Sequence, residues 1–238
     1  MLGVHDDGVD ALVLKLAGEL AAARVNGGLL VAGGGAPNAV SLHRARAAGL
    51  GGFEFASAIP GTAGGGVRMN AGAYGREWRD VLVEAVVVDA DGPRTLTLPE
   101  LDLSYRHSGI RPGQVVAEVT FRLDLSTEEA VKVKVRELLG RRKATQPTNK
   151  RTFGSVFKNP GPDLGAGRAI EACGLKGHVI GGAVISPRHA NFIENAGGAT
   201  SADCLALIAE ARRRVHEQYG VELQHEVQFL GPLELPPP

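Results

Sequence analysis

The chain has 238 residues, of which 44% are hydrophobic, and its 26 basic and 26 acidic side chains cancel. This balance argues against nucleic acid or an acidic membrane surface as the main partner. No apolar run reaches the ~20 residues of a membrane-spanning helix, and the first residues lack a secretory-signal pattern. The two cysteines, Cys173 and Cys204, form neither a disulfide framework nor a metal-binding spacing. We therefore expect a cytoplasmic protein without a metal site.

The first half of the chain is predicted to be rich in strands. Residues 9–16 are apolar mostly at alternate positions, which predicts a strand. A short buried strand is expected at 28–32, running into Gly33-Gly34-Gly35. Residues 37–48 are predicted to form a helix, because proline stands at its start and Gly49 follows its end.

A hairpin is predicted next, with strands at 81–89 and 94–98 around the turn Asp89-Ala90-Asp91-Gly92. Residues 114–123 alternate as in a strand with one face in a core. The apolar residues of that face are Val115, Ala117, Val119, Phe121 and Leu123.

The composition changes after Asp124, where we place a boundary between domains 1–124 and 125–238. A capping-box pattern opens a basic helix from 126 to Arg142, although Val131, Val133 and Val135 alternate like a strand. A second helix is predicted at 202–219, ending at Gly220. A strand is expected at 221–229.

The segment "IPGTAGGGVRMNAGAY" at 59–74, followed by Gly75, is the most unusual in the chain. Glycine lets backbone N–H groups approach a ligand closely, so the segment predicts either a cluster of structural turns or a ligand cradle. It does not fit the strand, Gly-x-Gly-x-x-Gly, helix order of a Rossmann fingerprint. Composition alone leaves both alternatives open.

Three polar motifs have structural interpretations that are favoured when each is considered alone. Residues 151–160 contain Ser155, Lys158 and Asn159 and predict either turn residues or the lining of a polar pocket. The motif at 105–108 suits a solvated loop with an extended arginine. Glu226, within the predicted terminal strand, is expected to face solvent, because carboxylates are rarely buried.

Five blocks of the sequence together resemble the UDP-N-acetylenolpyruvoylglucosamine reductase family. In chain order they are "GLGGFEFASAIPGTAGGGVRMNAGAYGREWRDV", "LDLSYRHSGI", "GSVFKNP", "GLKGHVIGGAVISPRHANFIENAGGATSADCLALI" and "YGVELQHEVQFLG". The resemblance extends from about Asp7 to Gly231 and implies an α+β fold. It implies an FAD-binding domain of the vanillyl-alcohol-oxidase (PCMH) type, followed by an α+β substrate-binding domain.

The resemblance also implies a chemistry. In that family NADPH reduces FAD, and the flavin then reduces the enolpyruvyl ether of UDP-N-acetylglucosamine to UDP-N-acetylmuramate for peptidoglycan synthesis. Arg106 and Glu226 correspond to residues that stabilise the enolic intermediate, and Ser155 corresponds to the proton donor. The protein is expected to act on this small molecule as a monomer.

The family's ligand contacts map onto two further sets of positions. The residues expected near the substrate are Tyr105, Arg142, Lys158, Asn159 and His189. The residues expected near FAD are Pro60, Gly61, Thr62, Ala63, Gly64, Gly65, Asn70, Ala71, Gly72, Ala73, Tyr74, Gly75 and Val116, with the glycine segment presenting backbone N–H groups to the cofactor.

The sequence departs from the family in two respects. The chain begins too late to contain the family's first lobe, with its Gly-Gly-Gly-Ser-Asn loop for the FAD diphosphate, and Gln228 stands where the family often has arginine. The short segment between Pro160 and Gly167 indicates the subclass without a tyrosine-bearing lid. We therefore expect an FAD-dependent oxidoreductase with an incomplete first domain, the alternative being a non-catalytic truncated or degenerate paralogue that has lost FAD binding.

Overall fold

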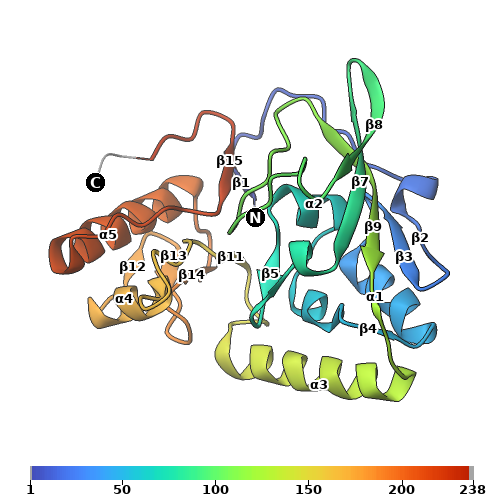
Figure 1. Cartoon of the computed structure of the whole chain (residues 1–238). Coiled ribbons are helices and arrows are strands. Elements are labelled where there is room, and N and C mark those ends of the chain that lie inside the picture. Colours follow the sequence, from blue (N-terminus) through green and yellow to red (C-terminus); the bar gives the residue numbers. More distant parts are fainter. Residues whose placement is uncertain (1, 236–238) are drawn as a thin grey trace. The chain divides into compact units, whose positions relative to one another are not determined.

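The computed structural model describes residues 2–235, so that Met1 and Pro236-Pro237-Pro238 lie outside the description. The chain forms two compact units. Residues Val13–Arg142 form one, called here the central unit, and the segments up to Leu12 and from Lys143 onward form the other, called the discontinuous unit. The mixed α+β architecture expected from the sequence is confirmed, with the elements labelled in Figure 1.

A five-stranded antiparallel sheet in the order β2-β3-β9-β7-β8 organises the central unit. The predicted hairpin is confirmed as β7 and β8, with Asp89 paired to Gly92. The strands are β2 (Ala23–Asn26), β3 (Leu29–Gly33), β7 (Leu82–Asp89), β8 (Gly92–Thr97) and β9 (Val115–Arg122).

Three helices and two short strand pairs complete the central unit. The predicted helix at 37–48 is confirmed as α1, and the expected helix after residue 126 is confirmed as α3. The elements are α1 (Asn38–Ala47), α2 (Ala63–Arg68), α3 (Glu128–Thr145, which ends just beyond the unit), β4 (Leu50–Gly51) with β10 (Asp124–Leu125), β5 (Gly72–Ala73) with β6 (Arg76–Glu77), and the 3-10 turns η1 (Gly18–Ala21), η2 (Glu54–Ala58) and η3 (Trp78–Asp80).

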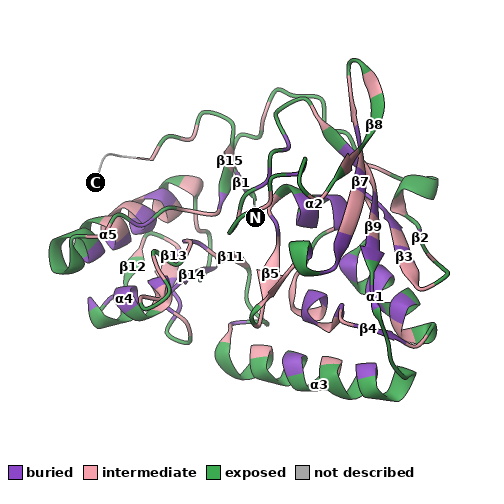
Figure 2. Cartoon of the chain, in the orientation of Figure 1, coloured by how far each residue is buried: buried purple, intermediate pink, exposed green. Residues whose placement is uncertain are grey.

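The core of the central unit is centred on Trp78, the only tryptophan in the chain. Its ring centre lies 5.3 Å from that of Phe53, 5.5 Å from that of Phe55 and 6.0 Å from that of Phe121. Such edge-to-face arrangements add to the free energy gained by burying apolar surface. Figure 2 shows buried residues along β3, β7 and β9 and on the helices beside them.

Strand β9 is irregular, which changes the face that the sequence pattern predicts to be buried. The pairing with β7 shifts between Val86 and Val87, so that Val87 lies opposite Val116 and Val86 opposite Glu118. The residue between, Ala117, forms a bulge. Val116 is therefore buried, whereas Val115, predicted to face the core, is exposed.

The discontinuous unit contains a sheet in the order β11-β14-β13-β12 and a parallel pair formed by β1 and β15. Its core includes Ile170 of α4 and Leu207 of α5, both fully buried. The elements are β1 (Leu2–Val4), β11 (Thr152–Ser155), α4 (Ala166–Ala172), β12 (Val179–Ile180), β13 (Ala183–Ile185), β14 (Phe192–Asn195), α5 (Ser201–Tyr219) and β15 (Gln228–Leu230).

Two predicted strands are wrong, one wholly and one in part. Residues 9–16 form no strand, and Leu12, Val13 and Leu14 expose 74–86% of their surface. Apolar alternation alone does not make a strand where no neighbouring strand accepts its hydrogen bonds. Of the strand predicted at 221–229, only its end belongs to β15, which begins at Gln228.

The division between the units also differs from the boundary predicted near residue 124. It falls after Arg142, because α3 packs on the central unit through Val131, which is buried in its core, and Val135. The first residues of the chain join the discontinuous unit through β1. Within residues 2–235, no helix combines the length and the apolar character of a membrane span.

Candidate functional site

The glycine segment at 59–75 contains a short helix, which the sequence pattern did not reveal. Thr62 begins α2 as its N-cap, its Oγ accepting a hydrogen bond from the Gly65 amide at 3.4 Å. Three glycines then occupy α2, although glycine is a poor helix former. The cap and the surrounding packing, rather than the intrinsic preference of these residues, determine the local structure.

The turn that follows β3 holds the start of the glycine segment in place. The amides of Ala63 and Gly64 donate to the carbonyls of Ala36 and Gly34, both at 2.9 Å. Asn38, the first residue of α1, donates its amide to Gly61 O and its Nδ2 to Ile59 O, both at 3.0 Å. The sequence analysis did not predict this role of Asn38. The only sign of it in the sequence is that a polar residue follows a glycine-rich turn.

Close packing favours glycine at some positions of this segment, and positive φ angles favour it at Gly61 (φ 120°) and Gly75 (φ 80°). A Cβ added at Gly66 would lie 2.3 Å from the Trp78 ring, and one at Gly64 would lie 2.9 Å from Gly34 O. At Gly61 and Gly75 an added Cβ would meet no atom within 4 Å, and at Gly65 it would meet only the Thr62 hydroxyl, at 3.5 Å. Gly64 and Gly66 are therefore packed against the protein, whereas Gly61, Gly65 and Gly75, called here the open side of the segment, have free space where a side chain would begin.

Several amides of the glycine segment already have partners. Besides those of Ala63 and Gly64, the Gly66 amide donates to Thr62 O at 2.9 Å and the Gly65 amide to the Thr62 hydroxyl. These four N–H groups donate within the protein. That the segment presents N–H groups to a cofactor stays a prediction.

Asn70 joins the glycine segment to its neighbours from a fully buried position. Its backbone has a φ of 39°, a left-handed conformation that asparagine tolerates better than most residues. Its Nδ2 donates to the Glu77 carboxylate and, at 2.9 Å, to Ser104 O, while its Oδ1 accepts from the Arg79 amide at 3.0 Å. Asn70 thus has a structural role, linking this segment to Ser104, which directly precedes the motif at 105–108.

Arg106 lies in that motif, in a tight turn closed by hydrogen bonds between Ser104 and His107. Its backbone φ is 54°, its Nη2 donates to Gly72 O at 2.9 Å, and its guanidinium carbon lies 4.9 Å from the centre of the Tyr105 ring. The structure therefore brings Arg106 together with Gly72 of the predicted cofactor set. A positive φ in a non-glycine residue costs about 1 kcal/mol or more and is often found at functional sites.

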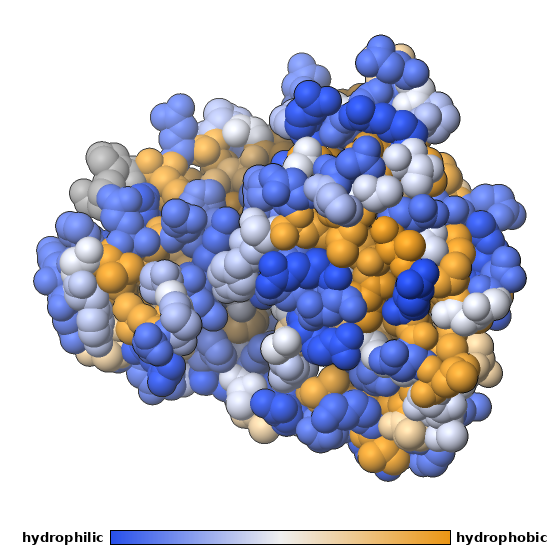
Figure 3. All heavy atoms as spheres, in the orientation of Figure 1, coloured by the Kyte–Doolittle hydropathy of each residue, from blue (hydrophilic) through white to orange (hydrophobic). Residues whose placement is uncertain are grey.

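Val116 of β9 also lies beside the glycine segment. A Cβ added at Gly64 would lie 3.1 Å from Val116 O, and one added at Gly34 only 1.8 Å from it. The Val116 side chain itself is buried. In Figure 3, apolar side chains gather on the surface over β7 and β9, between hydrophilic ones. Such a mixed surface suits a ligand with both a flat apolar ring and charged groups.

In the discontinuous unit, Ser155 and Glu226 lie on adjacent backbone segments. Ser155 ends β11, and the carbonyl of the next residue, Val156, accepts the Glu226 amide at 2.7 Å. One residue further, Phe157 is bridged to His225. Glu226 is outside β15, contrary to the sequence prediction of a continuous strand, and both Ser155 and Glu226 are half-buried. Arg106 belongs to the central unit.

Lys158 and Asn159 follow directly on the same segment as Ser155. The Lys158 amide donates to Gln224 O at 2.8 Å, and its side chain is half-buried. Asn159 Oδ1 accepts the Ala166 amide at 3.0 Å, so it satisfies an N–H group in the first turn of α4. At least part of the role of Asn159 is therefore structural.

His189 lies against α4 and Phe192. Its ring centre is 5.0 Å from that of Phe192, and its Nδ1 accepts the Asn191 amide at 3.3 Å. Burial, reinforced by the nearby Lys176 charge, lowers the pKa of His189 below its usual value of 6.5. His189 is therefore neutral at physiological pH. In that state its ring can form hydrogen bonds but carries no positive charge to attract an anion.

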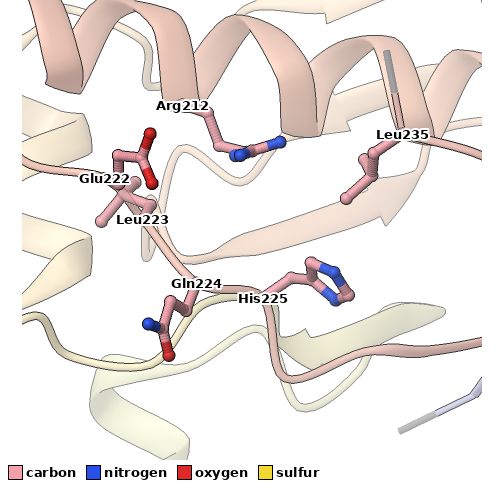
Figure 4. Close-up of a pocket in the computed structure, with 6 residues that line it drawn as sticks. All are labelled: Arg212, Glu222, Leu223, Gln224, His225 and Leu235. Atoms are coloured by element: carbon pink, nitrogen blue, oxygen red, sulfur yellow. The ribbon is translucent and has the colours of Figure 1, made fainter. Parts of the chain in front are cut away.

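A pocket of about 250 Å³ opens beside the segment that carries Glu226. Figure 4 shows Arg212 of α5 extending over it, with the His225 ring and Leu235 on one side and Glu222 on the other. Its remaining lining residues are Leu223 and Gln224. The sequence prediction did not include this pocket. Among residues 2–235, no group of three or more His, Cys, Asp or Glu side chains could hold a metal ion.

The open side of the glycine segment is the observation against which FAD can be tested. Gly61, Gly65 and Gly75 have room where a Cβ would be, so a dinucleotide can lie against the backbone there. These positions are all in the set expected from the sequence. In this respect the residues fit a bound FAD.

Comparisons with known proteins agree with this assignment. A family model described as "FAD binding domain" matches residues 2–96, and one described as "UDP-N-acetylenolpyruvoylglucosamine reductase, C-terminal domain" matches residues 146–230. The reductase of Anaeromyxobacter dehalogenans is 47% identical over 98% of this chain and 70% of its own, and reductase 2 of Symbiobacterium thermophilum is 44% identical over 97% and 75%. The crystal structure of the Thermus caldophilus reductase superposes with a TM-score of 0.83 at 35% identity, covering 95% of this chain and 81% of that one. The chain therefore belongs to the UDP-N-acetylenolpyruvoylglucosamine reductase family of FAD-containing oxidoreductases.

Proposed function

We propose that the protein reduces the enolpyruvyl ether of UDP-N-acetylglucosamine to UDP-N-acetylmuramate, with FAD as its cofactor and NADPH as the reductant. The observation that carries this proposal is the arrangement of Ser155 and Glu226. These residues are 71 positions apart in the sequence, yet they occupy neighbouring backbone segments because the Glu226 amide is bonded to Val156 O. A hydroxyl and a carboxyl on adjacent backbone segments are groups of the kind that protonates a carbon next to a carboxylate.

FAD would lie on the open side of the glycine segment, at Gly61, Gly65 and Gly75. When bound, it supplies the hydride chemistry, taking a hydride from NADPH and giving one to the terminal vinyl carbon of the substrate. The protein's own residues provide the orientation and the proton. We propose the central unit as the cofactor-binding part, which also contributes Tyr105, Arg106 and Arg142 to the substrate, and the discontinuous unit as the part that carries Ser155, Lys158 and Glu226.

Addition of a hydride to the vinyl group leaves negative charge on the adjoining carbon and its carboxylate. We assign Arg106 to stabilise that charge through its guanidinium group, and Glu226 to assist as an acid or hydrogen-bond donor. Ser155 then transfers its hydroxyl proton to the carbon and completes the reduction. A serine hydroxyl is a weak acid, so it can protonate only a strongly basic carbon, which hydride addition creates.

The remaining substrate contacts are assigned to side chains that can bind a nucleotide diphosphate. Arg142 and Lys158 supply positive charge, which phosphate oxygens favour. Tyr105, Asn159 and the neutral His189 supply hydrogen bonds or stacking. The product is a precursor of peptidoglycan, and we propose that the protein acts in the cytoplasm, where nucleotide sugars are made.

The first test is flavin binding by the whole chain. Purified protein titrated with FAD should show a flavin absorbance spectrum at close to one equivalent, and NADPH should bleach it. Adding the enolpyruvyl substrate should then restore the oxidised spectrum. Protein that stays colourless after titration would instead identify a paralogue that has lost FAD binding.

The second test concerns Ser155. Ser155→Ala should leave bleaching by NADPH unchanged but slow reoxidation by substrate by a factor of about 10² to 10⁴, the range usual for loss of a general acid. Stopped-flow absorbance separates the two half-reactions. Equal loss of both would refute the assignment of Ser155 as proton donor.

A further inference from the structure

Tyr74 occupies a backbone position that rarely accommodates a tyrosine. It forms, with Gly75, the two-residue turn between β5 and β6, since Ala73 pairs with Arg76 and Gly72 with Glu77. The φ angles of Tyr74 and Gly75 are 55° and 80°. Two consecutive positive φ angles define a turn that favours Asn, Asp or Gly at its first position and disfavours a bulky aromatic residue. The local turn therefore does not explain the tyrosine.

The contacts of the Tyr74 side chain do explain it, because both its ring and its hydroxyl engage helix α3. The hydroxyl donates to Leu138 O at 3.0 Å. The guanidinium carbon of Arg141 lies 5.0 Å from the ring centre, within the range of a cation–π interaction. Tyr74 thus binds α3 at two positions about one helical turn apart.

These contacts lie in the second half of α3, where Leu138 is buried but is not among the residues that pack on the main core cluster. Val131 and Val135, in the first half of the helix, pack on the main cluster, whereas the later residue Leu139 is exposed. Arg142 follows within one turn. Its Nε is buried, and it has no hydrogen-bond partner among the residues that the structure describes.

We propose that Tyr74 is a positioning residue for substrate binding, which fastens the end of α3 to the β5–β6 hairpin and so orients Arg142 toward the diphosphate of the nucleotide sugar. The proposal rests on the proposed function for the assignment of Arg142. It gives Tyr74 an indirect role in place of the direct contact with FAD that the family resemblance implies. Because Arg142 binds a part of the substrate remote from the reacting carbon, the effect concerns binding and not the chemical step.

The test uses two substitutions in the full chain loaded with FAD. Tyr74→Phe removes only the hydroxyl, and should raise KM for the nucleotide sugar about fivefold, the effect of one lost hydrogen bond. The turnover rate and FAD affinity should not change. Tyr74→Asn suits the turn better but removes both contacts with α3, so it should raise KM further without unfolding the hairpin. An unchanged KM in both variants, or a loss confined to kcat, would overturn the proposal.

A double-mutant cycle with Arg142→Met tests the route through Arg142. If Tyr74 acts by orienting Arg142, then Tyr74→Phe has no further effect on KM once Arg142 is removed. Additive effects would contradict the proposal.

Hydrogen–deuterium exchange provides a readout that needs no turnover. The amides of residues 138–142 should exchange about fivefold faster in Tyr74→Phe than in the unaltered protein, since the lost hydrogen bond held that turn closed. Amides of α3 near Val131 serve as the internal control and should not change. Equal exchange at 138–142 would refute the fastening role. If the unaltered protein does not reduce the nucleotide sugar, the proposed function fails. The exchange rates still show whether Tyr74 holds the end of α3.

Discussion

At the scale of single residues, Gly65 and Gly66 are neighbours in α2 with opposite surroundings. Gly66 faces the Trp78 ring, which is fully buried and enclosed by three phenylalanines. Gly65 is exposed, and only the Thr62 hydroxyl is near the space where its Cβ would be. The two positions therefore form a matched pair, in which the same added methyl group has different consequences.

Gly66→Ala should destabilise the protein by about 1–3 kcal/mol, the usual cost of overpacking a dense core. Gly65→Ala should stabilise the FAD-free protein by about 0.4–1 kcal/mol, because alanine restricts the unfolded chain without strain in the helix. It should also weaken FAD binding, since it places a methyl group on the open side of the segment. Urea unfolding and FAD titration of the two variants measure these effects. Equal destabilisation by both would contradict the packing described.

Residues such as these mark the limit of prediction from the sequence. The family resemblance pointed to the glycine segment, Arg106, Ser155 and Glu226, because their identities and order are distinctive. It could not show that Asn38 supports the segment, since that role depends on carbonyls more than 20 residues away that only the fold brings near. Nor could it show that the amides of 63–66 have partners within the protein.

At the scale of elements, the sequence predicted helices whose caps and periodicity agree. It failed for some strands, because whether and how a strand forms depends on the strands beside it. Helix α5 was predicted because Thr200 and Asp203 form a capping box and Gly220 ends the helix with a φ of 65°. Helix α2 was not predicted, because three of its residues are glycines and glycine is a poor helix former. The bulge in β9 was missed because it arises from the pairing with β7, which a single strand's alternation does not contain.

The cap of α5 allows a quantitative prediction. Thr200 Oγ1 accepts the Asp203 amide at 3.1 Å, so Thr200→Ala leaves that donor without its partner in the protein. The variant should lose about 1 kcal/mol of stability, as is typical for an N-cap threonine. Thr200→Ser keeps the hydroxyl and should remain close to the unaltered protein. Chemical denaturation, with a lower midpoint and an unchanged m value, checks the result, and equal midpoints for the two variants would disprove the cap's contribution.

At the scale of the whole molecule, the residues that the structure describes form two cores that share no residue, one in each unit. The single tryptophan, Trp78, lies in the core of the central unit, so its fluorescence reports the state of that unit alone. Far-UV circular dichroism reports helices in both. The two signals together can therefore follow the units separately.

Leu207→Ala creates a cavity in the core of the discontinuous unit, where Leu207 is fully buried, and should cost about 2–5 kcal/mol. The circular dichroism transition should shift to lower denaturant concentration by more than the fluorescence transition of Trp78, because the cavity is not in the tryptophan's core. Leu30→Ala, in the central unit, is the matched control and should shift the fluorescence transition instead. Identical shifts of both signals in both variants would show that the cores unfold as one.

The pairing of β1 with β15 has a consequence for how the protein is made. Leu2–Val4 are synthesised more than 220 residues before their partners Gln228–Leu230. The central unit is complete once Arg142 has emerged and can fold while synthesis continues. Strand β1, in contrast, cannot pair until β15 has also emerged. During biosynthesis the discontinuous unit is therefore completed after the central unit, because its sheet partners lie on both sides of the central unit in the sequence.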